Sequence, residues 1–456
     1  MNVFWHRRDL RIPDNRGLSL AAQEAETLPV FVVDTELLTR VGKRQRAFFM
    51  AGVRSLKAAY RERGGDLLVL AGDTVDVLER IVGAYDADRV YYNRHYRPAR
   101  REHERRVDAA LPTESVTDLV LVDPGRLDER YENHSRFHDD WEREPKHTPF
   151  DAPRGSRLVD VADDRTAPEI EADIDLPEAG YAASRARFDR FLDEEIESYA
   201  DARDDLPAAV ERPTTTVSRM SPYLAAGMIG IREVWADASE RRETATGDAR
   251  RNVEKYRYEL TWREQMYHLL YHNPHLATEN YRAFPNEIAW ENNPDHLAAW
   301  QRGETGYPLV DAGMRQLDSE GYVHNRPRQN VASFLAKHLL VDWREGARYF
   351  RQQLVDHDPA SNAGAWQWTA STGTDSVDVR IFDPVAQLAK YDPDATYVKR
   401  YVPELRDVPA EAVVDWPTLS DAEREELASD YPHPIVDRDD AYERAQRVFE
   451  RALGKR

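Results

Sequence analysis

A strand, a helix and a second strand follow one another in Pro29-Val30-Phe31-Val32-Val33, in the helix-length segment 44–63 and in Leu67-Leu68-Val69-Leu70. Both short runs are rich in branched apolar residues, which is typical of strands that are buried on both faces. A helix that connects two strands of one sheet makes them parallel, with a right-handed crossover. This segment therefore predicts a parallel α/β sheet.

The same alternation extends on both sides of this segment. Further apolar runs occur at 3–5, 89–92 and 118–122, and a second helix-length segment occurs at 74–85. We therefore expect an α/β domain with a Rossmann-like parallel sheet over residues 1–125. No G-x-G-x-x-G motif follows the first strand, so the sequence does not predict a Rossmann dinucleotide site.

The character of the chain changes after residue 125. Residues 126–180 are polar and rich in proline and predict an interdomain linker. From about residue 181 the apolar residues recur with helical periodicity, and no strand pattern of similar strength follows. We expect a larger all-α domain over 181–456, with helices near 183–197, 252–271, 307–316, 328–342 and 347–354.

Composition excludes several classes of protein. The 456 residues include no Cys, which rules out disulfides, thiolate nucleophiles, Cys-ligated zinc and iron–sulfur clusters. Redox chemistry would therefore need an organic cofactor or aromatic side chains, and we predict no metal site. No apolar run is long enough to span a membrane, and the N-terminus lacks a signal-peptide core. We expect a cytoplasmic protein that does not bind membranes.

The charge balance is strongly acidic. Asp and Glu number 83 against 63 Lys and Arg, a net charge of −20, and only eight of the basic residues are Lys. Acidic excess with scarce Lys favours a halophilic host, because concentrated salt screens the repulsion between carboxylates. An ordinary soluble acidic protein is the alternative. Residues 314–351 carry a local positive excess, which predicts a basic cavity or face there.

One stretch carries most of the chemistry: Asp356-His357-Asp358, Asn362, Trp366-Gln367-Trp368 and Thr372-Gly373-Thr374-Asp375. It places carboxylates, an amide and two indoles within 20 positions. This set suits a planar, electron-accepting ring and a stacked base better than it suits plain packing.

Two further clusters fall on predicted helices. Glu259, Trp262 and Arg263 follow an i, i+3, i+4 spacing, which puts an acid, an indole and a guanidinium on one helical face. An ordinary surface helix can show the same spacing. In the run 324–328, Pro327 fits a first helical turn and Asn325 lies near the cap. This run predicts either a capped helix start or a polar wall that faces a ligand.

Residues 217–222 place two hydroxyls, Ser218 and Ser221, before a predicted helix. Hydroxyls and backbone N–H groups at a helix start bind phosphate well, although an ordinary helix cap has the same appearance.

Taken together, these motifs show that the chain resembles the DNA photolyase/cryptochrome family over nearly its whole length. The segments that carry the resemblance occur in order at 5–11 with Asp14-Asn15, 218–222, 259–264, 300–317, 324–328, 356–375, 380–384 and 401–405.

The resemblance implies an FAD folded in a U-shape in the helical domain, and an α/β domain that binds an antenna chromophore. In the family, photoexcited reduced flavin donates an electron to a pyrimidine dimer that is flipped out of the duplex, the dimer splits, and the electron returns. Damaged DNA is thus the implied partner, and we expect a monomer.

The resemblance also implies roles for individual residues. The cofactor would contact Tyr199, Val217, Ser218, Arg219, Met220, Ser221, Arg263, Arg328, Asp356, His357, Asp358 and Asn362, the last facing flavin N5. The electron relay that reduces the flavin would be Trp366, Trp343 and Trp290, with Glu259 and Asn362 also catalytic. The dimer would contact Glu259, Trp262, Asn325, Arg326, Gln329 and Trp368, and Arg203 and Arg326 would meet its phosphates.

The chain departs from the family pattern at four places. Gln329 replaces Met, Val377-Asp378-Val379 replaces Pro-Tyr-Phe, Asp383 replaces Asn, and Gln265-Met266 replaces Phe-Tyr. These changes bear on the substrate side more than on the flavin. The paired histidines of (6-4) photolyases are missing, and the absence of Cys excludes the iron–sulfur branch.

Three functions follow from these residues. The first is light-driven repair of cyclobutane pyrimidine dimers, and the second is a cryptochrome-type blue-light photoreceptor with the same FAD and tryptophan relay. The third is a nucleotide-binding protein without flavin. The antenna stays open: residues 93–101 and Ala277 lack the Glu and Lys expected for a folate, which leaves a deazaflavin or no antenna.

Overall fold

The computed structural model describes residues 1–34, 38–214, 216–374 and 378–455. By their contacts these residues form two compact units. Unit 1 comprises Met1–Glu197, Ser218–His275 and Val355–Ala360, and unit 2 comprises Ser198–Val217, Leu276–Leu354 and Ser361–Arg456. This division differs from the one at residues 125 and 180 that composition suggests, because unit 1 also holds the predicted linker and several helices that follow it.

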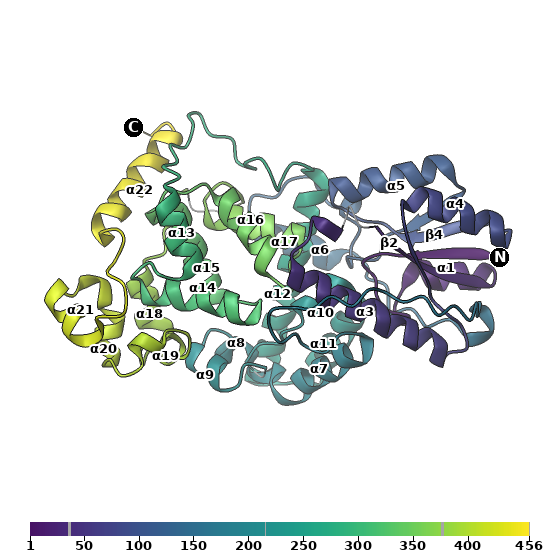
Figure 1. The fold of residues 1–456 in the computed structure, drawn as a ribbon, viewed down its shortest axis with the longest axis horizontal. Helices are drawn as coiled ribbons and strands as arrows, with labels where there is room; N and C mark the ends of the chain where they lie inside the picture. Colours follow the sequence, from purple (N-terminus) through teal and green to yellow (C-terminus); the bar gives the residue numbers. More distant parts are fainter. Residues whose placement is uncertain (35–37, 215, 375–377, 456) are drawn as a thin grey trace. The chain divides into compact units, whose positions relative to one another are not determined.

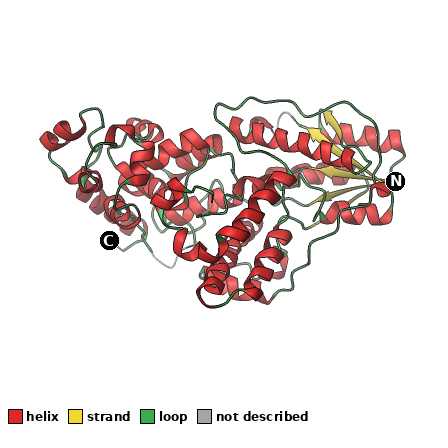
Figure 2. Ribbon diagram, turned by 90° about the horizontal axis from the view of Figure 1, so that it is seen from below, coloured by secondary structure: helices red, strands yellow, loops and turns green. Residues whose placement is uncertain are grey.

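Unit 1 is built around one parallel sheet (Figures 1 and 2). Its strand order is β3-β2-β1-β4-β5. The strands are β1 (Asn2–His6), β2 (Thr27–Val33), β3 (Leu68–Ala71), β4 (Arg89–Asn93) and β5 (Thr113–Val116). Every residue of β1 and β2 is buried, which is the reason for their continuous apolar sequence. The predicted parallel α/β fold is confirmed.

The fifth predicted strand is wrong. The last strand is β5, whereas residues 118–122 form a buried loop beside it. The backbone N–H groups of Leu121 and Val122 donate to the carboxylate of Glu264, and the carbonyl of Leu119 accepts from Arg263. This run is apolar because it is buried. Side chains, and not a neighbouring strand, supply hydrogen-bond partners for its backbone groups.

Helices cover both faces of the sheet. Figure 1 shows α4 and α5 on one side of the strands and α3 on the other, as right-handed crossovers require when the strand order reverses after β3. The helices of unit 1 are α1 (Arg16–Glu24), α3 (Lys43–Glu62), α4 (Thr74–Tyr85), α5 (Pro98–Ala110), α6 (His134–Arg143), α7 (Tyr181–Glu194), α10 (Ser221–Ala226), α11 (Ile231–Thr244) and α12 (Gly247–His272). The predicted linker is thus partly helical, because Phe137 and Trp141 of α6 are fully buried.

In its described residues unit 2 contains helices and no strand. They are α8 (Tyr199–Ala202), α9 (Leu206–Glu211), α13 (Pro294–Arg302), α14 (Pro308–Glu320), α15 (Asn325–Ser333), α16 (Trp343–Gln353), α18 (Pro384–Tyr391), α19 (Thr396–Tyr401), α20 (Ala410–Val414), α21 (Asp421–Ala428) and α22 (Arg438–Ala452). The helix α17 (Pro359–Thr369) begins in unit 1 and continues in unit 2. The predicted combination of an α/β part with a larger helical part is confirmed.

The start of α15 shows how the sequence sets a helix boundary. Pro327 lies in the first turn, as predicted, but the cap is His324, whose Nδ1 accepts from the N–H of Arg326. The observed helix therefore starts before the predicted range 328–342 and ends before the end of that range, since α15 passes into a π-helical turn at Phe334–His338.

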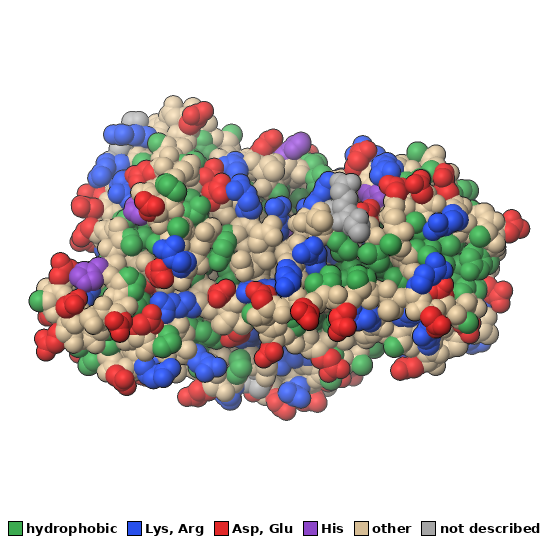
Figure 3. Space-filling model, viewed as in Figure 1, with side chains coloured by type: hydrophobic (Ala, Val, Ile, Leu, Met, Phe, Trp, Pro, Cys, Tyr) green, Lys and Arg blue, Asp and Glu red, His purple; other side chains and the backbone are tan. Residues whose placement is uncertain are grey.

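Acidic side chains are spread over the face of the molecule shown in Figure 3, with Lys and Arg between them. In the part of the chain that the structure describes, no helix has both the length and the apolar character needed to cross a bilayer.

Candidate functional site

One cavity of unit 2 gathers residues from three helices. It has about 450 Å³ of space, part of it open to solvent. Its lining consists of Asn325, Arg328, Gln329 and Ala332 from α15, Phe350 from α16, and Ser361, Asn362, Ala365, Trp366, Trp368 and Thr369 from α17. The lining positions of α15 follow i, i+3, i+4, i+7 spacing, so one face of that helix is presented to the cavity. The structure thus brings together five of the predicted cofactor and substrate residues and one predicted relay residue, Trp366.

Asn362 and Trp366 form one wall of this cavity. The Asn362 amide donates to the carbonyl of Ala347 at 3.0 Å, which fixes the orientation of the side chain. Trp366 is only 3% exposed, and its ring packs edge-on against Phe350 at 5.1 Å between centroids. A second indole, Trp300, lies 6.2 Å from Trp366. The wall therefore combines an oriented amide with a rigid aromatic surface.

The three predicted relay tryptophans belong to one hydrophobic core of unit 2. Trp366 and Trp343 are buried in this core, and the partly exposed Trp290 packs against it. The indole N–H of Trp343 donates to Asn280 at 2.9 Å. The set therefore includes two buried rings and one that reaches the surface of the unit.

The two arginines predicted to meet phosphates share one carboxylate. Arg326 pairs with Asp204, and the Nε of Arg203 lies 3.4 Å from the same side chain. Burial alone would raise the pKa of Asp204, but the two guanidinium groups outweigh it and lower that pKa. Arg326 also donates to Gln329 at 3.2 Å and lies over the ring of Tyr391. These arginines are therefore oriented by contacts within the protein.

Acidic partners also offset the predicted positive excess of 314–351. Arg315 pairs with Glu404 and Arg326 with Asp204, two carboxylates outside this segment, whereas Arg344 and Arg348 pair with Asp342 and Glu345, which the excess already counts. Arg328 remains in the lining of the unit 2 cavity. The basic character predicted from sequence is thus smaller than a count of residues suggests.

In unit 1, Asp358 lies in a buried polar network. Arg8 forms an ion pair with its carboxylate, and the hydroxyl of Tyr267 donates to it. Burial raises the pKa of Tyr267, so this hydroxyl keeps its proton. The carbonyl of His357 accepts from Gln45 at 2.5 Å. Sequence reasoning missed Arg8 and Tyr267, although Arg8 lies in the first matched motif.

The predicted face of α12 forms as the spacing indicates. Glu259 pairs with Lys255 at 2.6 Å. The guanidinium of Arg263 donates to Leu119 and lies 4.8 Å over the ring of Tyr267. Trp262 is half-buried.

The predicted phosphate segment is divided between the units. Tyr199 and Val217 belong to unit 2, whereas residues 218–221 belong to unit 1 and lead into α10. The carbonyl of Ser218 accepts from Arg187 at 2.9 Å, and Arg219 has a positive φ of 51°. Met220 is buried at the cap position, and Ser221 is exposed. The left-handed residue turns the chain sharply just before the helix.

Several departures from the family pattern have local partners. Gln265 lies 2.7 Å from His134. Asp383 caps α18 and pairs with Arg438 of α22, and Asp378 pairs with Arg282 and Lys455. In unit 2, therefore, Gln329 lines the cavity while Asp378 and Asp383 face the C-terminal part. Asp375 and Val377 lie outside the described residues.

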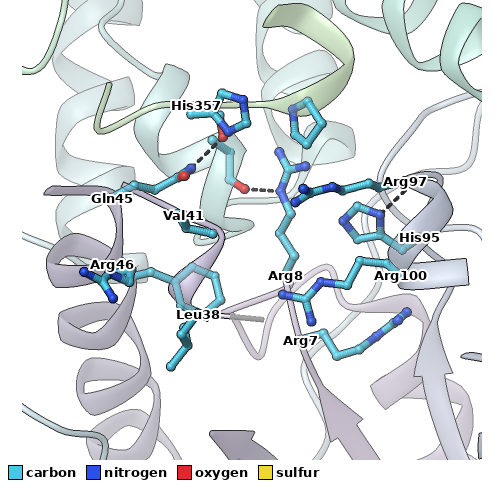
Figure 4. A pocket seen from close by; sticks show the side chains of 13 residues that line it. Arg7, Arg8, Leu38, Val41, Gln45, Arg46, His95, Arg97, Arg100 and His357 are labelled. Carbon is cyan, nitrogen blue, oxygen red and sulfur yellow. Dashed lines mark hydrogen bonds between the residues drawn. The ribbon is translucent and has the colours of Figure 1, made fainter. Parts of the chain in front are cut away.

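Unit 1 has a second cavity, at the carboxyl ends of its strands (Figure 4). It lies where the strand order reverses between β1 and β4, the position at which open α/β sheets bind ligands. Its space of about 630 Å³ is partly open to solvent, and a neighbouring cavity of about 370 Å³ shares some of its lining. The larger cavity is lined by Arg7, Arg8, Leu38, Val41, Gln45, Arg46, Phe49, His95, Arg97, Arg100, Ala225, His357 and Pro359.

Cations dominate this second cavity. Figure 4 shows the guanidinium groups of Arg8, Arg97 and Arg100 gathered on one side, with Arg46 of α3 opposite them. Burial, and then the neighbouring charges of Arg7 and Arg97, lowers the pKa of Arg100 to about 9. Burial, and then the charges of Arg8 and Arg7, lower the pKa of His95 well below its usual value. A bound anion would relieve this repulsion.

Comparisons with known proteins identify the family of this chain. Residues 2–154 match the DNA photolyase family, and residues 256–451 match the FAD binding domain of DNA photolyase. A deoxyribodipyrimidine photo-lyase of Halobacterium salinarum is 41% identical over the full length of both chains. The chain therefore belongs to the DNA photolyase/cryptochrome family, and its helical part contains the FAD-binding domain of that family.

Two solved structures have the same fold. A class III photolyase from Agrobacterium tumefaciens is 32% identical with a TM-score of 0.88, and covers 100% of this chain and 98% of its own. An archaeal photolyase from Sulfolobus tokodaii with two FAD molecules is 30% identical with a TM-score of 0.85, and covers 99% of this chain and 100% of its own.

Proposed function

We propose that this protein is a deoxyribodipyrimidine photo-lyase, a flavoenzyme that uses blue light to split cyclobutane pyrimidine dimers in DNA. The observation that carries the proposal is the unit 2 cavity. It joins an oriented Asn362, a cationic Arg328 and the buried Trp366 to Trp368, Gln329 and Asn325. These are the two kinds of side chain that the function needs, one set for a flavin and one for a base.

The residues present fit FAD. Asn362 can present its amide oxygen to the flavin ring because the amide nitrogen is bound to Ala347. The guanidinium of Arg328 would favour an anionic ring. Tyr199 and residues 217–221 would hold the phosphates and the ribityl chain. When bound and reduced, FAD supplies the photoexcited electron.

The substrate would be a dimer flipped out of the strand. Trp368 and Trp262 would stack on it, and base–aromatic stacking contributes about 1–3 kcal/mol per base. Glu259 and Gln329 would bond to the polar edges of the dimer, while Arg203 and Arg326 would approach phosphates. Flipping costs less for a damaged pair, so the lesion itself favours binding. We expect the enzyme to act as a cytoplasmic monomer.

Direct repair tests this function. The reduced holoprotein is illuminated with blue light in the presence of a dimer-containing single strand, and the ultraviolet absorbance of thymine is followed. We expect the absorbance to recover in the light and not in the dark. Photoreduction of the flavin without recovery of thymine would instead identify a photoreceptor.

The cationic cavity of unit 1 fits a second chromophore that carries negative charge. Arg8, Arg97 and Arg100 face an apolar wall that includes Leu38, Val41 and Phe49. We propose a flavin-type or deazaflavin antenna with an anionic tail. Reconstitution with FMN, FAD or a deazaflavin tests this proposal: the expected result is binding that Arg100→Gln weakens. Retention of a neutral chromophore alone would contradict it.

A further inference from the structure

His134 covers one face of the Trp262 indole ring. The two ring centroids are 3.7 Å apart, and the planes are inclined by 9°. His134 opens α6 and Trp262 lies on α12, both within unit 1. His134 is 6% exposed whereas Trp262 is half-buried. The exposed part of the indole therefore lies on its other face or at its edges.

Two polar contacts fix the imidazole against the indole. Its Nδ1 lies 2.7 Å from the Oε1 of Gln265, and its Nε2 lies 3.0 Å from the hydroxyl of Thr261. Thr261 and Gln265 flank Trp262 on α12 and are buried. Burial lowers the pKa of His134 to about 4, so the ring is neutral near neutral pH. In a neutral ring Nδ1–H donates to Gln265, and the single hydroxyl proton of Thr261 is shared between Nε2 and the carbonyl of Tyr258, which lies 2.8 Å from the hydroxyl oxygen.

We propose that His134, held by Gln265, is a positioning residue that fixes Trp262 as a one-sided stacking platform for the lesion. This inference rests on the proposed repair function. An indole already held in place loses less side-chain freedom when a base stacks on its open face. It also gives a reason for Gln265, which replaces an aromatic residue of the family pattern: the imidazole needs an acceptor that a hydrocarbon ring lacks.

The order of Trp262 can be measured without DNA. The holoprotein is labelled with fluorotryptophan, and the Trp262 signal is assigned by its loss in Trp262→Phe. His134→Ala should shift and broaden this signal, because the ring current and the support of the imidazole are both lost. Gln265→Leu should broaden it with a smaller shift, since both rings remain. An unchanged Trp262 signal in His134→Ala would overturn the proposal.

His138→Ala is the matched control for these variants. His138 lies one turn further along α6; its ring contacts Tyr258 and Trp141 and lies 6.4 Å from that of His134, whereas of the two only His134 stacks on Trp262. We expect its removal to leave the Trp262 signal in place. Equal disturbance of the signal in His138→Ala would show that any damage to α6 moves Trp262, and would also overturn the proposal.

Lesion affinity tests the functional consequence. In the dark, His134→Ala should raise the Kd for a dimer-containing strand about tenfold and leave the Kd for an undamaged strand unchanged. The repair yield of the saturated complex should not change, because His134 would act through Trp262 alone. His134→Phe, which keeps a stacked ring, should recover most of the affinity.

The two proposals fail in different ways. If the wild-type protein shows no preference for dimers, the proposed function is wrong, while the fluorine signal still decides whether His134 holds Trp262. If the wild type prefers dimers but His134→Ala binds them equally well, the positioning role is wrong and the proposed function stands.

Discussion

The guanidinium of Arg380 lies 4.7 Å from the centroid of the Trp368 indole ring. Phe382 also approaches this ring, at 6.1 Å between centroids. Trp368 lines the unit 2 cavity together with Asn325 and Gln329. One side of this indole is therefore in contact with a cation, a contact worth about 0.5–2 kcal/mol, and another side is presented to the cavity.

Removal of Trp368 should weaken lesion binding and leave the flavin bound. Trp368→Ala removes the stacking interaction with one base, so we expect the Kd for dimer-containing DNA to rise by about 10- to 100-fold. Flavin absorbance measured on the purified variant should match that of the wild type. Arg380→Gln should produce a smaller loss, since the indole remains. Loss of flavin from Trp368→Ala would show that this residue belongs to the cofactor site.

Trp343→Phe should block photoreduction of the flavin. Trp343 is fully buried in the hydrophobic core that also contains Trp366, and the partly exposed Trp290 packs against this core. A phenyl ring is a much poorer electron donor than an indole. Illumination with an external reductant should no longer accumulate reduced flavin, yet chemically reduced enzyme should still repair dimers.

The matched control is Trp416→Phe, which removes an equally buried indole from a different core of unit 2. We expect this variant to photoreduce normally. Normal photoreduction in Trp343→Phe would contradict the relay assignment.

The sequence predicted the elements of this fold where periodicity was strong. The helix predicted at 74–85 matches α4, and the first four strands lie where the apolar runs are. Residues 118–122 misled the prediction because burial, and not strand pairing, selects their apolar side chains. A single sequence does not show that their backbone partner is Glu264, far along the chain.

The candidate site was predictable to the same extent. The family resemblance assigns Asn325, Arg328 and Gln329 to the cofactor and the dimer, and all three line one cavity. The sequence did not predict the partners of the site residues, which are Arg8 and Tyr267 for Asp358 and Asp204 for Arg203 and Arg326. These contacts join residues that are distant in sequence, and no local pattern records them.

Asp358→Asn should destabilise unit 1. The carboxylate of Asp358 neutralises the buried guanidinium of Arg8. Removing one partner of a buried ion pair costs about 3–5 kcal/mol because the other charge is left unpaired. We expect a lower midpoint in urea and a lower content of bound flavin. Tyr267→Phe, which removes only a hydrogen-bond donor, should lose about 1–3 kcal/mol. Equal stability of the two variants would show that Arg8 finds another partner.

Stability should fall as the pH drops below about 6.5, the ordinary pKa of histidine. Burial lowers the pKa values of His134, His268 and His338 to about 4. Between those values the unfolded chain binds more protons than the folded protein, so the free energy of unfolding rises with pH across this range. Above about pH 6.5 these histidines contribute a constant amount to the free energy of unfolding.

Urea titrations at several pH values between 4.5 and 6.5 measure this slope, in the interval where each such histidine contributes up to about 1.4 kcal/mol per pH unit. His338→Gln removes one titrating group, and the slope should decrease accordingly. An identical slope in the variant would mean that His338 does not titrate on unfolding. His147→Gln serves as a control, because His147 is exposed at the surface whereas His338 is buried.

Asp204 should control how strongly the protein binds undamaged DNA. Its carboxylate is paired with Arg326 and lies beside Arg203, the two cations expected to approach phosphates. In Asp204→Asn these cations lose their internal counter-charge. Affinity for an undamaged single strand should therefore increase at low salt, and the slope of log K against log salt should steepen by about 0.7 for each additional phosphate contact. At molar salt the variant and the wild type should bind alike, since counterion release then contributes little and stacking by Trp368 dominates.

The measurement is a series of Kd values for damaged and undamaged strands at increasing KCl. Asp407→Asn is the control, because it removes the same charge from an exposed position of unit 2. If both variants steepen the salt dependence equally, net charge alone explains the effect. If neither does, Arg203 and Arg326 do not contact phosphates, and the lesion is held by the cavity without them.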